Sequence, residues 1–320
     1  MSIREQRPRK HRKTPANKRL GVQSTDRPAQ GERIAKVIAR AGLCSRREAE
    51  TWIAAGRVML NGETLATPAV TVTEADTVLV DGMPLPAIDR TCVVLFHKPA
   101  GLVTTTRDPE GRPTVFSALP KDLPRLVTVG RLDIATEGLL VLTNNGALAR
   151  ALELPANAVT RRYKARVRGR VSQDTLDRLA EGVTIDGVRY RPIDANQIQG
   201  TGGANAWIEL GLTEGKNREV RRVLDWLGVS VNRLIRTGYG PFGLANLASG
   251  KTLEVPDREI DALLKNLGLP ADTHLSRDRS VKDDATAVKK PKPRSYKGRR
   301  KPDAETNKEK PTSRSKRTGR

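Results

Sequence analysis

The sequence predicts an α+β fold with two folded domains, a small α/β domain followed by a larger domain built on a mixed, largely antiparallel sheet. Two short helical patterns and two Asn/Asp-Gly turns lie together near the N-terminus. From residue 91 onward, strand-like runs and short helical patterns alternate irregularly, without the regular β-α-β order of a parallel sheet. Basic segments flank this region at both ends. We therefore expect a disordered basic arm over 1–30, the small domain over 31–90, the larger domain over 91–270 and a disordered basic tail over 271–320.

The two terminal segments carry most of the excess positive charge of the 320-residue chain. Residues 1–30 hold nine Lys and Arg against two acidic residues, and residues 271–320 hold seventeen against seven. They account for +7 and +10 of a formal net charge of +22. Segments with this composition cannot form a core, because they lack large apolar side chains. Solubility is one interpretation of such arms, but two of them at opposite ends favour attraction to nucleic-acid phosphates.

Several other classes of protein are disfavoured by the sequence. No apolar run is long enough for a membrane-spanning helix, and the N-terminus MSIREQRPRK has no signal-peptide core. Cys44 and Cys92 form no spaced pair, so we expect no disulfide and a reducing, cytoplasmic location. Of the three histidines only His97 lies in the predicted folded part, so we expect no metal site. We also expect no nucleotide cofactor, because we recognise neither a GxGxxG nor a GxxxxGK(S/T) phosphate loop.

The small domain begins with two helical patterns. Ile34 and Ile38 have helical spacing in ERIAKVIARAG, and Gly42 is expected to end that helix. Ser45 with Glu48 three residues later predicts a capping box at the start of the second helix, which Gly56 would end. Two short strand patterns follow, in RVMLNGETL and DTVLVDGMPL, and each contains a hairpin turn, Asn-Gly or Asp-Gly.

Basic residues crowd the two helices of this domain and the turn after them. A solvated helix face is the ordinary explanation of such a charge run. However, the pattern GERIAKVIARAGLCSRREAETWIAAGRVMLNG resembles the RNA-binding domain named after ribosomal protein S-four, over residues 32 to about 80. The resemblance implies that the helix pair presents its cations to structured RNA, which is recognised through shape and phosphate contacts. The residues expected to bind RNA here are Arg33, Lys36, Arg40, Arg46, Arg47 and Arg57.

The larger domain shows six strand-like runs, with helices expected after Asn145, Ser172 and Gly215. Its chemistry is concentrated in three polar elements: GRLD with Arg131 and Asp133, RRYKARV with Tyr163, and the helix in TEGKNREVRRVLDWLG. The strand-like runs are TCVVLFHKP, RLVTV, GLLVL, RRYKARVRG, TIDGVRYR and AWIELGL.

The predicted helix after Gly215 is amphipathic. Val220, Val223, Leu224 and Leu227 form its apolar stripe, and a helical wheel directs Arg218, Arg222 and Asp225 away from it. Arg221 lies at the edge of the stripe, so it can turn toward a buried carboxylate. Each polar residue also has a structural explanation: Asp133 as a turn cap, Tyr163 as a core residue and Arg221 as a rim residue.

Taken together, the three elements resemble the bacterial pseudouridine synthases of the small-subunit and large-subunit ribosomal RNA type. GRLDIATEGLLVLTNNG is similar to the family's catalytic motif, and RRYKARVRG and EGKNREVRRVLDWLG match its tyrosine and basic segments, within a similarity that covers residues 32 to about 265. The resemblance implies that Asp133 is the essential carboxylate, Tyr163 stacks on the target base, and Arg221 is the ion-pair partner of Asp133. Arg131 would aid base extrusion, and Lys216, Arg218 and Arg222 would bind RNA.

The resemblance also implies a substrate and a reaction. The NREVRR segment is most similar to the large-subunit synthase B branch, so we expect the substrate to be ribosomal RNA, most simply a large-subunit precursor. We also expect the protein to be a monomer. Isomerising uridine involves no redox change and loses no atom, so no cofactor is required. The target must be flipped out of stacked RNA, and an ionised, shielded Asp133 would then act as nucleophile or as base, a choice left open by the sequence.

Three other functions are alternatives to this one. A non-catalytic RNA-binding assembly factor, or a synthase acting on small-subunit RNA, would share much of the pattern. A glycosidase would need a second carboxylate facing Asp133, and none is recognised.

Overall fold

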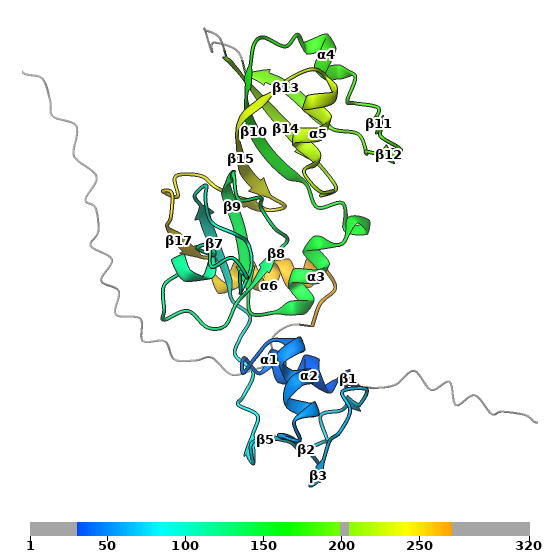
Figure 1. Ribbon diagram of the computed structural model, residues 1–320, viewed down its shortest axis with the longest axis vertical. Coiled ribbons are helices and arrows are strands. Elements are labelled where there is room, and N and C mark those ends of the chain that lie inside the picture. The colour runs from blue at the N-terminus through cyan, green and yellow to red at the C-terminus, as the bar shows by residue number, and fades with distance from the viewer. Residues whose placement is uncertain (1–30, 199–204, 271–320) are drawn as a thin grey trace, which may run out of the picture. The chain divides into compact units, whose positions relative to one another are not determined.

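The computed structural model describes residues 31–198 and 205–270 of the chain (Figure 1). The predicted basic arms at 1–30 and 271–320 lie outside the described residues. None of the described helices is both long enough and apolar enough to cross a membrane.

The N-terminal domain pairs two helices with short antiparallel strands. Helix α1 (Ile34–Arg40) and helix α2 (Arg46–Ala54) bury Ile34, Ile38, Ala49 and Ile53 in a common core. One small sheet has the order β3-β2-β5-β6, and β1 pairs with β4. The strands are β1 (Glu32–Arg33), β2 (Val58–Leu60), β3 (Glu63–Thr64), β4 (Thr71–Val72), β5 (Val78–Val80) and β6 (Met83–Pro84).

The local signals predicted for this domain are confirmed. Both hydrogen bonds of the Ser45–Glu48 capping box are present at the start of α2. Asn61 and Gly62 have φ angles of 51° and 90°, as the hairpin turn between β2 and β3 requires. Asp81 and Gly82 repeat this conformation between β5 and β6, with φ angles of 51° and 78°.

The larger domain is built on a nine-stranded sheet within the described residues. The strand order is β13-β14-β10-β15-β9-β7-β17, with β16 paired to β15 and β8 to β9. All of these pairings are antiparallel except that of β15 with β9, so the predicted mixed, largely antiparallel sheet is confirmed. The strands are β7 (Val93–Lys98), β8 (Val127–Val129), β9 (Thr136–Thr143), β10 (Arg161–Arg168), β13 (Asp194–Ile198), β14 (Asn205–Leu212), β15 (Val231–Tyr239), β16 (Phe242–Gly243) and β17 (Thr252–Glu254).

Helices cover the two halves of this sheet separately (Figure 1). Helices α4 (Gln173–Asp177) and α5 (Glu219–Trp226) pack against β10, β13, β14 and β15. Helices α3 (Gly146–Glu153) and α6 (Asp257–Asn266) pack against β7, β8 and β9. Side chains of Asn145 and Ser172 cap α3 and α4, which confirms two of the predicted helix starts. The short 3-10 helices η1 (Phe116–Ala118) and η2 (Pro155–Asn157) lie in connections.

Two expectations for the larger domain need correction. TIDGVRYR is a hairpin of β11 (Thr184–Ile185) and β12 (Val188–Arg189) rather than one strand, because Asp186 and Gly187 adopt positive φ angles of 49° and 75°. A Gly-rich GxGxxG spacing does occur in the sequence, at residues 238–243. It forms the β15–β16 hairpin and opens no helix, so it lacks the helix N-terminus that binds dinucleotide phosphates.

Gly138 is required where β9 and β15 run parallel. It has a φ of 104°, and a Cβ placed on it would lie 2.3 Å from the carbonyl oxygen of Arg236. We expect Gly138→Ala to lower the free energy of unfolding by about 3 kcal/mol or more, because backbone cannot move aside cheaply. Urea denaturation would measure this loss.

Gly169 is the matched control for this prediction. Its φ is 86°, but no atom lies within 4 Å of the added Cβ. Gly169→Ala should therefore incur only the strain of the left-handed conformation, about 1 kcal/mol. Equal losses for the two variants would contradict the role given to the close approach of β9 and β15.

Candidate active site

A cavity of about 490 Å³ opens in the larger domain beside β10 and β15 and the N-terminal end of α5. It brings together residues far apart in the sequence, from the loop before β9, from strand β10 and from the segment that leads into α5. Of the site residues predicted in this domain, all but Arg222 line it: Arg131, Asp133, Tyr163, Lys216, Arg218 and Arg221. Arg222 lies on the exposed side of α5.

The loop that carries Asp133, residues 130–135, is held through its backbone. Gly101 donates its N–H to the Ile134 carbonyl at 2.7 Å, and the Thr104 hydroxyl donates to the Leu132 carbonyl at 2.8 Å. Leu132 is itself buried in the core. The loop is therefore fixed on both sides of Asp133, by the segment that follows β7 as well as by the start of β9.

Lys98, at the end of β7, completes this support and was missed by sequence reasoning. Its side chain is fully buried, and Nζ donates to the carbonyls of Pro99, Ile134 and Thr136 at 3.0, 3.3 and 2.9 Å. Burial lowers the pKa of this ammonium to about 8, and the charge of Asp133 opposes the shift. A lysine directly after an apolar strand, in FHKPAG, was the available signal.

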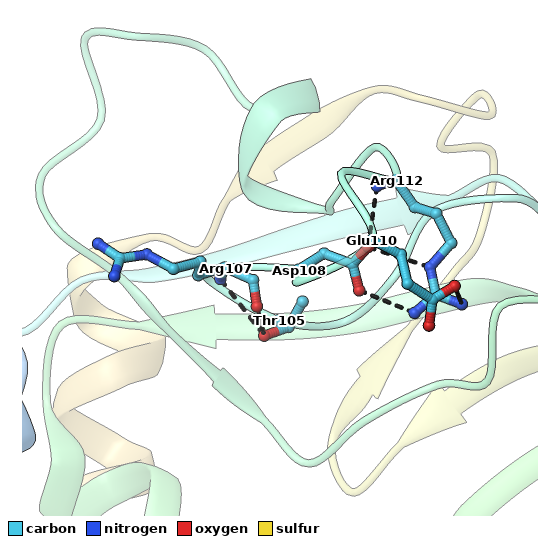
Figure 2. A network of polar contacts seen from close by, with 5 residues as sticks. All are labelled: Thr105, Arg107, Asp108, Glu110 and Arg112. Carbon is cyan, nitrogen blue, oxygen red and sulfur yellow. Dashed lines mark hydrogen bonds and ion pairs between the residues drawn. The ribbon is translucent and has the colours of Figure 1, made fainter.

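The segment continues into a loop closed by its own polar network (Figure 2). Asp108 accepts hydrogen bonds from Arg112, from the backbone N–H at 2.8 Å and from Nε and Nη2 at 3.1 and 2.8 Å. The Thr105 hydroxyl donates to the Arg107 carbonyl at 2.9 Å, and the Arg107 side chain extends away from the network. These bonds stiffen the loop whose first residues support Asp133.

The ion pair of Asp133 differs from the expected one. Arg218 Nη1 lies 3.5 Å from Asp133 Oδ2, whereas Arg221 Nη1 donates to the Val231 carbonyl at 3.0 Å. The helical wheel directed Arg218 outward, but Arg218 precedes the helix as its N-cap, with a left-handed φ of 51°, so helical periodicity does not apply to it. The structure thus pairs Asp133 with Arg218, and a pairing of Asp133 with Arg221 stays a prediction.

Asp133 is also less enclosed than expected, since 37% of its side chain is exposed. Arg221 occupies the predicted edge of the apolar stripe and is half-buried. Burial lowers the pKa of its guanidinium, as does the charge of Arg218, and Asp133 acts in the opposite sense. Its Nε is buried without a hydrogen-bond partner among the described residues.

Tyr163 lies in the middle of β10 and forms one wall of the cavity. It packs against two of the hydrophobic cores, and its cross-strand neighbours are Leu210 on β14 and Arg236 on β15. Ala165 and Val167 share its face of the strand and are buried, as the alternation predicted.

Two carboxyl groups that sequence reasoning missed lie at the entry to α5. Glu219 is 4% exposed; its Oε2 accepts the Lys216 N–H at 2.7 Å, and its Oε1 has no partner among the described residues. Burial and the neighbouring Glu214 raise the pKa of Glu219 to about 7. Burial acts in the same sense on Glu214, but hydrogen bonds from Lys216 and from the Arg191 N–H lower its pKa overall.

Glu219 should make stability depend on pH in a defined window. Because its pKa is raised from an ordinary 4.5 to about 7, the folded state binds this proton more tightly than the unfolded state. The contribution is fully present below pH 4.5 and is lost as pH rises through 7. Glu219→Gln, whose amide is neutral at every pH, should flatten this dependence and raise the unfolding temperature at pH 8 relative to the unaltered protein.

Thermal unfolding of both proteins at pH 5 and pH 8 would test this prediction. Glu181→Gln, which removes an exposed carboxylate, serves as the control and should leave the pH dependence unchanged. A Glu219→Gln variant that loses stability equally at both pH values would show that Glu219 is ionised throughout.

The cations predicted to bind RNA in the N-terminal domain lie on its surface, but three of them form ion pairs within the domain. Lys36 and Arg40 pair with Glu32, and Arg57 pairs with Asp81 while stacking on Trp52 at 4.5 Å. Arg33, Arg46 and Arg47 are exposed and form no ion pair with a described residue. Within 31–198 and 205–270, no three His, Cys, Asp or Glu residues gather as a metal site would require.

Comparisons with known proteins agree with these features. Residues 92–226 match the RNA pseudouridylate synthase family, and residues 32–78 match the S4 domain. An uncharacterised RNA pseudouridine synthase of Rickettsia felis is 40% identical over 230 residues, which cover 72% of this chain and 99% of that protein. Ribosomal large subunit pseudouridine synthase B of Haemophilus influenzae is 42% identical over 270 residues, which cover 80% of this chain and 74% of that protein.

A solved structure of a pseudouridylate synthase has a similar fold. The crystal structure of a pseudouridylate synthase superposes with a TM-score of 0.52 at 25% identity, over 72% of this chain and 99% of that one. With an S4 domain, a synthase domain and 40% identity along 99% of the Rickettsia felis protein, the chain belongs to the RNA pseudouridine synthase family.

Proposed function

We propose that this protein converts a specific uridine of large-subunit ribosomal RNA into pseudouridine, and that Asp133, Tyr163 and Arg221 are its catalytic residues. The single observation that supports the proposal most is the cavity, because side chains from three distant segments converge there in one chain. The similarity to large-subunit synthase B supports the choice of RNA. We propose a monomer, because one chain supplies the whole proposed site. We propose that it acts in the cytoplasm, where its ribosomal RNA substrate would be made.

The chemistry follows from the geometry of the cavity. A uridine flipped out of the RNA would enter beside Tyr163, whose ring offers a stacking surface, and Arg131 at the exposed rim would fill the space left in the RNA. Asp133, on a loop fixed by Lys98, Gly101 and Thr104, would then act on the ribose. It either attacks C1′ as a nucleophile or removes the C2′ proton as a base.

The positive groups around the cavity would hold the RNA backbone. Lys216 and Arg218 line the cavity, and Arg222 lies on the outer side of the same helix. We propose that these residues contact phosphates near the target. The N-terminal domain would add contacts to structured RNA through Arg33, Arg46 and Arg47, with Lys36, Arg40 and Arg57 exchanging their internal carboxylates for phosphates.

Mapping pseudouridines would test this function. Large-subunit and small-subunit RNA from cells with and without the protein would be compared, and the missing modification restored in vitro with purified protein. Loss of one pseudouridine in large-subunit RNA is expected. An unchanged large-subunit map would reject the proposed substrate, and a site lost from small-subunit RNA would reassign it.

A further inference from the structure

Arg236 is a buried cation in the wall of the cavity that no sequence pattern singled out. It lies on β15, the strand between β9 and β10, and is 2% exposed. Its Nε donates to the Leu139 carbonyl at 2.7 Å, but its Nη2 is buried with no hydrogen-bond partner among the described residues. It forms no ion pair within 31–198 and 205–270.

A second buried cation, Arg161, shares the ring of Tyr239 with Arg236. The guanidinium carbons of Arg236 and Arg161 lie 5.0 and 4.9 Å from the centre of the Tyr239 ring, so both guanidinium groups stack on it. Arg161 is buried too, and it donates to the Val159 and Glu153 carbonyls and to the Tyr239 hydroxyl. Its acceptors are neutral, so neither of these two buried cations is paired with a carboxylate of the described residues.

Burying two cations in this way is costly for the fold. A buried charge without a counter-ion destabilises a fold unless a ligand supplies the opposite charge. Since Arg236 lines the cavity and keeps an unused N–H donor, the opposite charge is expected on what enters the cavity.

The position of Arg236 relative to Tyr163 indicates which part of the substrate carries the opposite charge. The two residues stand directly opposite each other on β15 and β10, and residues so paired project on the same face of a sheet. If Tyr163 stacks on the uracil, the guanidinium of Arg236 lies beside the same base. This step rests on the proposed function: with a uracil stacked on Tyr163, the opposite charge would be carried by that base.

We propose that Arg236 stabilises the uracil anion released when the glycosidic bond breaks. In either reaction of Asp133, the bond between N1 and C1′ breaks and its electron pair stays on the uracil, spread over N1 and the carbonyl oxygens. C5 then bonds to C1′, the proton of C5 is lost and N1 gains a proton, while Asp133 is released or returns its proton. The isomerisation balances without an oxidant, and a fixed guanidinium donor lowers the barrier of its first step.

Arg236→Met tests the proposal, with Arg166→Met on the exposed face of β10 as the matched control. Single-turnover rates would be measured on a large-subunit RNA fragment containing the target uridine. We expect the Arg236→Met rate to fall by about 10²–10³-fold, with RNA affinity within about threefold. Its unfolding temperature should be unchanged or higher, because an uncompensated buried charge is removed. Arg166→Met should keep its rate, and Arg236→Lys should recover part of it.

A second substrate separates stabilisation of the leaving group from other roles. The fluorine of 5-fluorouridine withdraws electrons, so the uracil anion is more stable and depends less on Arg236. Fluorine at C5 cannot leave as the C5 proton does, so on this substrate the reaction stops short of pseudouridine, and the step to follow on both substrates is cleavage of the N1–C1′ bond. The defect of Arg236→Met in this cleavage rate should therefore be much smaller on RNA with 5-fluorouridine at the target. Equal defects on both substrates would overturn the proposal, and equal defects with weakened affinity would assign Arg236 to a phosphate instead.

Failure of this inference can be told from failure of the proposed function. If the unaltered protein forms pseudouridine and Arg236→Met does so equally fast, only the role of Arg236 is wrong. If the unaltered protein forms none, the proposed function falls and the role of Arg236 with it. A lowered unfolding temperature with equal rate losses on both substrates would make Arg236 a structural residue.

Discussion

Asp133→Asn should abolish pseudouridine formation while leaving RNA binding within a few fold. The amide is nearly the same size as the carboxylate, but it can neither attack C1′ nor accept a proton from C2′. The described part of the cavity offers Glu153, Glu214 and Glu219 as its other carboxyl groups, and all three have other bonds: Glu153 accepts the Gly130 N–H, and the two at α5 are bound to Lys216. We therefore expect a loss of about 10⁴-fold or more in single-turnover rate.

Two further variants sharpen this test. Asp122→Asn removes one exposed negative charge from the same domain and should leave the rate unchanged. Asp133→Glu keeps the charge but moves the carboxylate by one methylene on a loop that Lys98 and Thr104 hold in place, so it should also be nearly inactive. Measurable turnover by Asp133→Asn would refute the assignment of Asp133 and would place the chemistry on a different carboxyl group.

Local sequence signals predicted most of the fold, because they act within a few residues. The capping box of Ser45, the Asn61-Gly62 turn and the caps at Asn145 and Ser172 each depend on neighbours in the chain. Strand β15 was not predicted, although it stands between β9 and β10, because charged residues interrupt its apolar pattern. Helix α6 was also missed, although Ile260 and Leu264 have helical spacing and are buried.

Whether a signal is local in the sequence also explains which site residues were predicted and which were missed. Asp133, Tyr163 and Arg221 sit in motifs, and the cavity does bring them together. Lys98 and Arg236 depend on contacts between distant strands, with carbonyls of β9 and its preceding loop, which no local pattern encodes. Arg218 was misplaced for a local reason, since a residue with left-handed backbone just before a helix lies off the helical wheel.

Arg221→Met should reduce the single-turnover rate by about 10²–10³-fold, although Arg221 does not pair with Asp133 in the structure. Arg221 is half-buried in the cavity, where its charge is poorly screened, and its Nε has no partner among the described residues. Its Nη1 donates to one backbone carbonyl, that of Val231, so its other donors are available to Asp133 or to a flipped nucleotide that enters the cavity. Met keeps the length of the side chain and its packing but removes the charge.

Arg218→Met and Arg222→Met are the variants that decide how Arg221 acts. Half of the Arg218 side chain is exposed, so its 3.5 Å ion pair with Asp133 is screened by water, and we expect a loss of about tenfold or less. Arg222 faces outward, so its replacement should weaken RNA binding and flatten the salt dependence of affinity while the saturated rate stays the same. If Arg218→Met were the inactive variant and Arg221→Met retained its rate, Arg218 would be the working partner of Asp133. Equal loss of rate in Arg221→Met and Arg222→Met would instead show that charge at α5, rather than the inward position of Arg221, is what catalysis requires.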